Sequence, residues 1–255
     1  MRFIFTGTGT SQGVPVIACT CPVCRSEDSR DKRLRTAGLL CSDTATLAID
    51  AGPDFRQQML RHEVRHLDAV VLTHSHKDHV GGLDDVRPYN YLQQRDMPVY
   101  GSRATLDHLH REYYYIFERP DYPGIPKLLL HEIGEAPFEA AGMALQPVPV
   151  WHSKMPVLGF RTGDFAYITD ASEIPEASMQ LLSGVKILVI NALRIEPHYS
   201  HFNLDQALAA AEAIGPKQAW FTHISHLMGR HAEVSARLPG WAQLAWDGLE
   251  LRWDA

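Results

Sequence analysis

The sequence predicts an α/β protein in which two sheets are flanked by helices. Short apolar runs bounded by turn residues recur along all 255 residues, and several of them end in a side chain that can bind a metal. Segments of helical period stand between these runs. No linker divides the chain and no sequence repeat is present, so we expect a single domain over residues 1–255.

The first half supplies a strand, a glycine loop and then a succession of strands and helices. The loop has the spacing G-x-G-x-x-x-G and no clear helix after it, which excludes a dinucleotide-binding fingerprint. In chain order we expect a strand at 3–6, the loop at 7–15, a strand at 44–50, a helix at 54–65, a buried strand at 69–72, a helix beginning within 81–91 and a short strand at 98–100.

The second half repeats one pattern, an apolar strand that leads directly into a possible ligand. A helix is expected at 203–214, with Asn203 or Asp205 near its start, and residues 246–249 should form a turn that closes a final hairpin. The strands with their ligands are 144–150 with His152, 165–169 with Asp170, 187–190 with Asn191, and 219–222 with His223.

Two stretches depart from this rhythm. Residues 18–36 form a Cys- and Arg-rich excursion, and residues 105–130 form a helix with an aromatic-rich extension. The tyrosines of the second stretch could pack over the core or a dimer interface, or they could line a substrate pocket. The sequence leaves both interpretations open.

A cluster of metal-ligand types follows the buried strand at 69–72. The run Thr73-His-Ser-His-Lys-Asp-His79 contains three histidines and one aspartate, a density that a histidine-rich surface loop would explain poorly. Imidazole suits zinc, iron, manganese and nickel, and a carboxylate can bridge two ions. One ion could take His74, His76 and His152, and the other Asp78, His79 and His223, with Asp170 between them.

Cysteine spacing predicts a second, closed metal site. Cys19, Cys21 and Cys24 lie close together, and His226 stands three residues beyond His223. A Cys3His set binds a structural zinc in most proteins, although three unliganded buried thiols are the alternative. Cys41 lies apart and is expected in the core or in a loop.

Composition narrows the class of protein. The net charge is −6 and no basic block stands out, which argues against a protein held to nucleic acid by charge. No apolar run approaches the roughly 20 residues that span a membrane, and the first residues lack the features of a signal peptide. Together with cysteines spaced for metal binding, these features predict a cytoplasmic protein.

The Thr73–His79 run, with the later His152, Asp170 and His223, resembles the metallo-β-lactamase-fold hydrolases. The resemblance covers essentially the whole chain. It implies an αββα sandwich with a dinuclear metal site at one edge of the two sheets. It also implies that Asp50 orients the ligands without binding metal itself.

Further motifs resemble the PhnP family, the phosphoribosyl cyclic phosphodiesterases of bacterial phosphonate breakdown. These are the 7–15 loop, the Cys-x-Cys-x-x-Cys excursion, Cys41-Ser42 and the run 222–226. This resemblance implies a homodimer that converts 5-phosphoribosyl 1,2-cyclic phosphate into ribose 1,5-bisphosphate, with manganese or a similar ion in the active site and zinc at the cysteines.

The implied mechanism is attack on phosphorus by a hydroxide that the two ions share. His201 matches the family's general acid and would protonate the departing ribose oxygen, with His198 as the local competitor. The metal ligand Asp78 is counted with His201 as a catalytic residue. The aromatic segment is longer than expected for the family, which leaves the phosphodiester substrate open.

Three other functions fit parts of the pattern. A tRNA 3′-processing nuclease of the same fold would need a long basic arm, and none is visible. A glyoxalase-type thioesterase would explain neither the cysteines nor His201. A metal or redox sensor could use the Cys3His cluster as its reporter, but it would be expected to have lost one of the seven active-site ligands.

Overall fold

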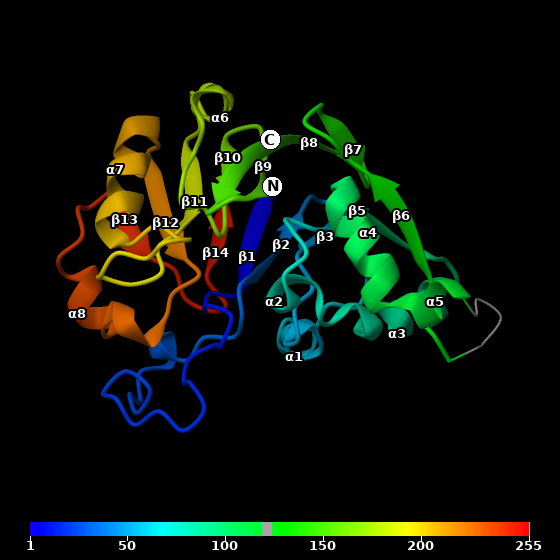
Figure 1. The fold of residues 1–255 in the computed structure, drawn as a ribbon, viewed down its shortest axis with the longest axis horizontal. Coiled ribbons are helices and arrows are strands. Elements are labelled where there is room, and N and C mark those ends of the chain that lie inside the picture. The colour runs from blue at the N-terminus through cyan, green and yellow to red at the C-terminus, as the bar shows by residue number, and fades with distance from the viewer. Residues whose placement is uncertain (119–123, 255) are drawn as a thin grey trace.

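Two seven-stranded sheets lie face to face, and helices cover their outer surfaces (Figure 1). This computed structural model describes residues 1–118 and 124–254. The αββα sandwich expected from the sequence is confirmed. Residues 119–123 of the aromatic-rich segment lie outside the described residues.

The first sheet has the strand order β14-β1-β2-β3-β4-β5-β6. Its members from β14 to β3 pair antiparallel, and those from β3 to β6 pair parallel. The strands are β1 Arg2–Gly7, β2 Ala37–Cys41, β3 Thr46–Ile49, β4 Ala69–Val71, β5 Met97–Gly101, β6 Leu128–Glu132 and β14 Glu250–Arg252. The helices beside it are α1 Phe55–Arg61, α2 Lys77–Val80, η2 Leu83–Val86, α3 Arg87–Gln93, α4 Arg103–Glu112 and α5 Tyr114–Glu118. The short helix η1 Ser29–Asp31 lies in the excursion before β2, where Asp31 accepts a hydrogen bond from the His231 amide.

The second sheet has the order β13-β12-β11-β10-β9-β8-β7, and β10 to β13 pair parallel. The strands are β7 Phe138–Ala140, β8 Met143–His152, β9 Met155–Thr162, β10 Phe165–Tyr167, β11 Ile187–Asn191, β12 Gln218–Thr222 and β13 Ala242–Leu244. The helices are α6 Glu176–Leu181, α7 Leu204–Ile214, η3 His226–Met228 and α8 His231–Ser235.

Three apolar layers hold the sandwich together. Phe3 and Phe160 belong to the layer between the sheets, Phe55 to the layer under the helices of the first sheet, and Phe221 to the layer under those of the second. Full burial of such a side chain stabilises the fold by about 1.5–3 kcal/mol. Because both sheets are packed on two faces, their strand ends are held firmly in place.

The expectations about the strands were incomplete, and one was wrong. Strands β2, β6, β7 and β9 were not predicted. Strand β2 was missed because its apolar run directly follows the Arg-rich excursion, and β6 begins within the 105–130 segment that was expected to be a helix with an aromatic-rich extension. Residues 246–249 do form a turn, in which the Leu249 amide donates to the Trp246 carbonyl at 3.0 Å. They do not close a hairpin, however, because β13 pairs with β12 in one sheet and β14 pairs with β1 in the other.

The expected helices are present with shifted bounds. The helix predicted at 54–65 is α1, which begins after Asp54 and ends at Arg61. The helix predicted to begin within 81–91 is α3, preceded by the short helix η2. Helix α7 begins at Leu204, where Asn203 and Gln206 form a capping box.

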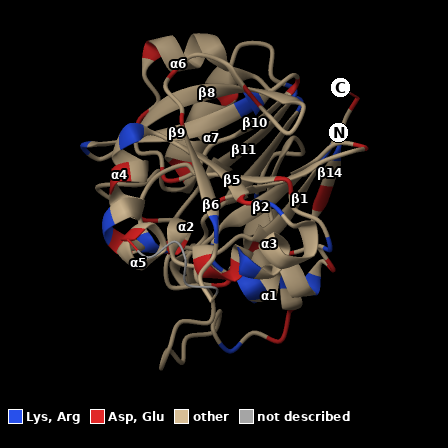
Figure 2. Ribbon diagram, turned by 90° about the vertical axis from the view of Figure 1, so that its right-hand side faces the viewer, with Lys and Arg blue, Asp and Glu red and all other residues tan. Residues whose placement is uncertain are grey.

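Charged residues of both signs are interleaved along several helices. Figure 2 shows Lys and Arg beside Asp and Glu around α1, α4 and α5. Within the described part of the chain, no helix is both long and apolar enough to cross a membrane.

Candidate metal centre

The predicted ligands lie where parallel strands of both sheets end. His74 follows β4, Asp170 follows β10 and His223 follows β12, and each of the three is no more than 2% exposed. Asp50, Asp170 and His223 have positive φ angles of 66°, 56° and 55°, which are uncommon outside glycine. Such backbone strain is concentrated at functional sites, where the surrounding packing maintains it.

Asp170 stands at the middle of the cluster. Its Oδ2 lies 2.9 Å from His79 Nε2, and its Oδ1 lies 3.0 Å from His223 Nε2. Asp78 Oδ2 lies 3.3 Å from His79 Nε2 and 3.6 Å from His223 Nε2. The structure therefore brings Asp78, His79 and His223 together as one possible ligand set, with Asp170 beside it.

The other predicted set is less compact. The His76 ring centroid lies 4.7 Å from that of His74 and 5.1 Å from that of His152. The tight groups of ligand atoms instead join His74 to His79 and Asp170, and His152 to Asp170 and His201. His76, exposed at the N-cap of α2, is near the cluster but belongs to neither group.

Several histidines are held by one ring nitrogen while the other faces the cluster. His79 Nδ1 lies 2.7 Å from Asp50 Oδ2, and His152 Nδ1 lies 2.7 Å from the Ser200 carbonyl oxygen. His74 Nδ1 lies 3.0 Å from Thr73 Oγ1. Metal-binding histidines are typically oriented in this way, because the bond at one nitrogen fixes the tautomer that leaves the other free.

The Nε2 atoms of the clustered histidines are suitable ligands for metal ions. Within the described chain, the Nε2 atoms of His74, His79 and His223 are buried and make no hydrogen bond of acceptable geometry, although those of His79 and His223 lie 2.9 and 3.0 Å from Asp170 oxygens. An unsatisfied buried polar atom costs about 1–3 kcal/mol, so three of them around one carboxylate call for ligands. The donor set of imidazole and carboxylate suits zinc, manganese, iron or nickel.

Asp50 supports the cluster from outside. It accepts hydrogen bonds from the Thr73 amide at 2.8 Å and from the Thr73 hydroxyl at 3.0 Å to Oδ1 and 2.9 Å to Oδ2. Burial raises the pKa of Asp50, and the neighbouring His79 opposes that rise. Asp50 thus contacts Thr73 and His79 from outside the groups of possible ligands, and its orienting role stays a prediction.

The pKa values of the histidines in the cluster depend strongly on burial and on the neighbouring carboxylates. Burial lowers the pKa of His79, but Asp170, Asp50 and Asp78 outweigh it and hold that pKa well above its ordinary value. Burial alone dominates at His74, whose pKa is lowered well below 6.5. The cluster thus combines acidic and basic groups, and bound cations would displace protons from its imidazoles.

His201 contacts the central carboxylate. Its Nε2 lies 2.6 Å from Asp170 Oδ1, and its Nδ1 lies 3.0 Å from Ser200 Oγ and 3.3 Å from His198 Nδ1. Burial lowers the pKa of His201 to about 4, so the ring is neutral at pH 7 in the free protein. An anion bound beside it would favour the protonated form.

The cysteine cluster is compact. The Sγ atoms of Cys19, Cys21 and Cys24 lie 3.3, 3.4 and 3.5 Å from His226 Nδ1. A tetrahedral zinc with bonds of about 2.3 Å to sulfur and 2.0–2.1 Å to nitrogen separates these atoms by about 3.6 Å. The four side chains therefore have the spacing of a closed zinc site, and within the described residues all four cysteines are free of disulfides.

The thiols differ in their protonation. The Cys24 amide donates to Cys21 Sγ, and this bond lowers the pKa of Cys21 to about 6. Burial raises the pKa of Cys24 to about 11. The site therefore already offers one thiolate at neutral pH, the form that binds metal.

The glycine loop at 7–15 is hydrogen-bonded to the chain next to His223. Ile224, next to His223, donates its amide to the Thr8 carbonyl at 2.8 Å and accepts from the Thr10 amide at 3.1 Å. The glycine loop at 7–15 thus links the metal centre to the cysteine excursion, where Val14 packs with Val23 and Cys24.

Sequence reasoning missed several supporting groups. Asn191, expected as a possible ligand, instead receives the Ala171 amide at 2.7 Å and donates to the Ala171 carbonyl at 2.9 Å. It thereby holds the chain next to Asp170. The Ser200 carbonyl could not have been found, because a backbone acceptor leaves no residue pattern.

Comparison with known proteins decides the family. Residues 46–224 match the beta-lactamase superfamily domain. A solved structure described as a new diphosphatase from the PhnP family is 41% identical, with a TM-score of 0.92 over 98% of this chain and 97% of its own. The chain belongs to the PhnP family. It is accordingly a metallo-β-lactamase-fold hydrolase.

Other relatives place this PhnP-family chain within a wider group. An octanoyltransferase of Porphyromonas gingivalis is 40% identical over 98% of this chain, but the chain spans only 51% of that relative. Coenzyme PQQ synthesis protein B of Methylobacterium nodulans is 27% identical over 75% of this chain and 72% of its own length. Human short-form tRNase Z, with 16% identity and a TM-score of 0.71 over 99% of both chains, shares the fold.

Proposed function

We propose that this chain is a metal-dependent phosphodiesterase, with 5-phosphoribosyl 1,2-cyclic phosphate as the first candidate substrate and ribose 1,5-bisphosphate as its product. The observation that carries the proposal is the set of buried, unpartnered imidazole nitrogens around Asp170. Bound there, two divalent ions would supply a nucleophilic water at neutral pH and neutralise charge on phosphoryl oxygens.

The predicted ligands fall into two sets, one for each ion. His74, His76 and His152 would hold one ion, and Asp78, His79 and His223 the other, with Asp170 shared. Asp50 fixes the tautomer of His79 through the 2.7 Å contact at Nδ1. The buried ligands exclude bulk water from their side of the centre, which strengthens each electrostatic contact.

His201 would give a proton to the departing oxygen. It is mostly buried and reaches the ligand Asp170 with Nε2, while Nδ1 is held by Ser200. A negative phosphodiester next to this ring raises its affinity for a proton, which is what a general acid requires. His198 lies farther out, and among the described residues its hydrogen bonds toward the cluster are to Ser200 and His201.

A second candidate is hydrolysis of a diphosphate bond. The 41% identical member of the PhnP family is described as a diphosphatase. A diphosphate presents the same charged phosphoryl oxygens, and the same constellation could receive it. The octanoyltransferase name belongs to a relative about twice the length matched here and gives no comparable support for acyl transfer.

The test is a comparison of substrates on one metal-reconstituted preparation. Phosphorus NMR would follow 5-phosphoribosyl 1,2-cyclic phosphate, a linear diphosphate diester and bis(p-nitrophenyl) phosphate, with Asp170→Asn as the inactive control. Turnover of the cyclic ester at the highest kcat/KM supports the first candidate, and preference for the diphosphate supports the second. Two bound ions without turnover of any phosphoric ester would refute both.

A homodimer, a cytoplasmic location and a role in phosphonate breakdown remain predictions that follow from this proposal. The same holds for the identity of the ions, manganese or zinc first and iron or nickel next, and for a structural zinc at Cys19, Cys21, Cys24 and His226.

A further inference from the structure

Helix α2 carries two predicted ligands but has little support of its own. It spans only Lys77–Val80, a single turn without a side-chain cap at its first residue. A helix this short is not stable by itself, so its neighbours must define its position. That position determines where Asp78 and His79 point.

The two ligands differ in how they are fixed. His79 is held through its ring by Asp50. Asp78 has polar contacts only with His79 and His223 among the described residues, and these are themselves predicted ligands. Its placement therefore depends on the backbone of α2.

One side of that backbone rests on the loop after β3. The Ala51 amide donates to the His79 carbonyl at 2.8 Å, and the Gly82 amide donates to the Ala51 carbonyl at 2.8 Å. A Cβ atom on Gly52 would lie 1.9 Å from the Asp78 carbonyl oxygen, so the two segments are in direct contact.

The other side rests on the aromatic-rich segment. The Tyr113 side chain is 3% exposed, and its hydroxyl donates to the carbonyl of Val80, the last residue of α2, at 2.7 Å. Glu112 forms an ion pair with Lys77, whose ammonium lies 5.9 Å from the Tyr113 ring centroid. Tyr115 donates to Asp84 in η2 at 2.5 Å.

We propose that Tyr113 is a positioning residue for the metal centre, acting through the C-terminal end of α2 on the placement of Asp78. This gives the aromatic-rich segment a role in the centre itself rather than only in the core. The inference rests on the proposed two-ion centre, and it concerns the ion held by Asp78, His79 and His223.

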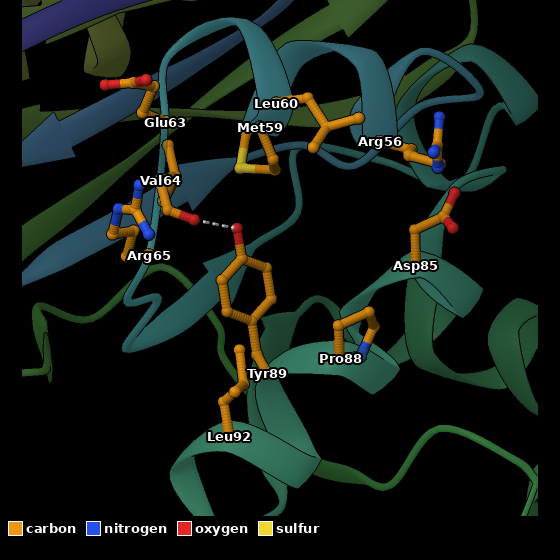
Figure 3. A pocket seen from close by; sticks show the side chains of 10 residues that line it. All are labelled: Arg56, Met59, Leu60, Glu63, Val64, Arg65, Asp85, Pro88, Tyr89 and Leu92. Atoms are coloured by element: carbon orange, nitrogen blue, oxygen red, sulfur yellow. Dashed lines mark hydrogen bonds between the residues drawn. The ribbon is translucent and has the colours of Figure 1, made fainter.

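The chain offers a matched control. Tyr89 of α3 is 6% exposed and donates its hydroxyl to the Val64 carbonyl at 2.8 Å, as Figure 3 shows. None of the ten residues drawn around that contact is a predicted ligand. Tyr113→Phe and Tyr89→Phe therefore each remove one tyrosine-to-carbonyl hydrogen bond, buried in the first case and partly buried in the second, and only the first touches α2.

The experiment is a Mn²⁺ titration of chelator-treated protein with one equivalent of Zn²⁺ restored, in which electron paramagnetic resonance reports free Mn²⁺. We expect Tyr113→Phe to weaken one of the two Mn²⁺ binding steps by about 10-fold, which is the usual effect of removing an outer support of a ligand. We expect Tyr89→Phe to weaken neither step by more than about 2-fold. Both variants should lose a similar amount of thermal stability.

Wild-type affinity in Tyr113→Phe, or equal weakening in Tyr89→Phe, would overturn the positioning role. Because no substrate enters the titration, a wrong substrate assignment leaves this result unaffected. Conversely, unchanged Mn²⁺ binding in a variant of an enzyme that turns over phosphodiesters would remove the inference and leave the proposed function standing.

Discussion

His79 Nδ1 lies 2.7 Å from Asp50 Oδ2, and both side chains are no more than 1% exposed. A buried carboxylate that faces a ring N–H keeps the proton on Nδ1. Nε2 therefore faces Asp170, 2.9 Å away, and it becomes a metal ligand when a cation displaces its proton. This one contact decides whether His79 can act as a ligand.

Asp50→Asn should disrupt that arrangement with little change in shape. The amide can still accept from Thr73 through its oxygen, but its NH2 group then faces His79 and favours a proton on Nε2. We expect metal affinity to fall about 10–100-fold. Metal analysis after dialysis at fixed free Mn²⁺ would measure it, and full occupancy in the variant would contradict the tautomer argument.

The variant His201→Ala should show whether His201 acts as a general acid or as a metal ligand. Loss of a positioned acid lowers turnover by about 10²–10⁴-fold. Metal content should stay at the wild-type level, although His201, His152 and Asp170 are close enough to share an ion. A variant that loses an ion would make His201 a ligand instead.

The neighbouring histidine provides the comparison for this experiment. His198→Ala should change kcat by no more than a few-fold, because among the described residues the hydrogen bonds of His198 toward the cluster are to Ser200 and His201. The two variants would be assayed side by side with bis(p-nitrophenyl) phosphate. A larger defect in His198→Ala than in His201→Ala would exchange their roles.

The sequence could indicate the metal centre because its ligands are either adjacent or directly follow apolar strands. The run from His74 to His79 is local, and a parallel strand that ends in Asp170 or His223 must deliver that residue to the sheet edge. The position at a strand end did not predict the role of Asn191, because it places a residue at the sheet edge without showing which groups its side chain contacts. Its amide pairs with the backbone of Ala171.

Other features depend on contacts between residues far apart in the chain. Tyr113 and Val80 are separated by 33 residues, and no periodicity relates them. The sequence also does not show that the chain passes from the second sheet to the first after β13, because the turn at Trp246 and Leu249 resembles an ordinary hairpin turn. Tertiary packing, not local preference, decides both.

Cys21→Ser should remove the structural zinc. Cys21 has the lowered thiol pKa of about 6 and lies 3.4 Å from His226 Nδ1, so it is the readiest of the three thiols to bind metal. We expect one zinc fewer per chain and a lower melting temperature. Cys41→Ala is the control, since Cys41 is buried in a core layer and should lower stability without releasing zinc. Equal zinc content in Cys21→Ser and wild type would refute the site.

A buried histidine away from the metal centre should make stability depend on pH. His231 is 3% exposed, its Nδ1 lies 3.2 Å from Arg33 Nη2, and its amide donates to Asp31 at 2.7 Å. Burial, with Arg33 and Arg30, lowers its pKa to about 4, against the weaker pull of Asp28 and Asp31.

Because the folded pKa lies below the unfolded value of about 6.5, the unfolded chain binds the proton more tightly. The contribution of neutral His231 is complete above pH 6.5 and is lost as the pH falls toward 4. Between pH 7.5 and pH 5.5, the free energy of unfolding should fall by about 1 kcal/mol more in the wild type than in His231→Asn. In that variant the amide oxygen of Asn can still accept a hydrogen bond from Arg33. Urea unfolding of both proteins at pH 7.5 and 5.5 measures the difference and cancels acid effects that they share. Parallel pH profiles would show that His231 titrates alike in both states.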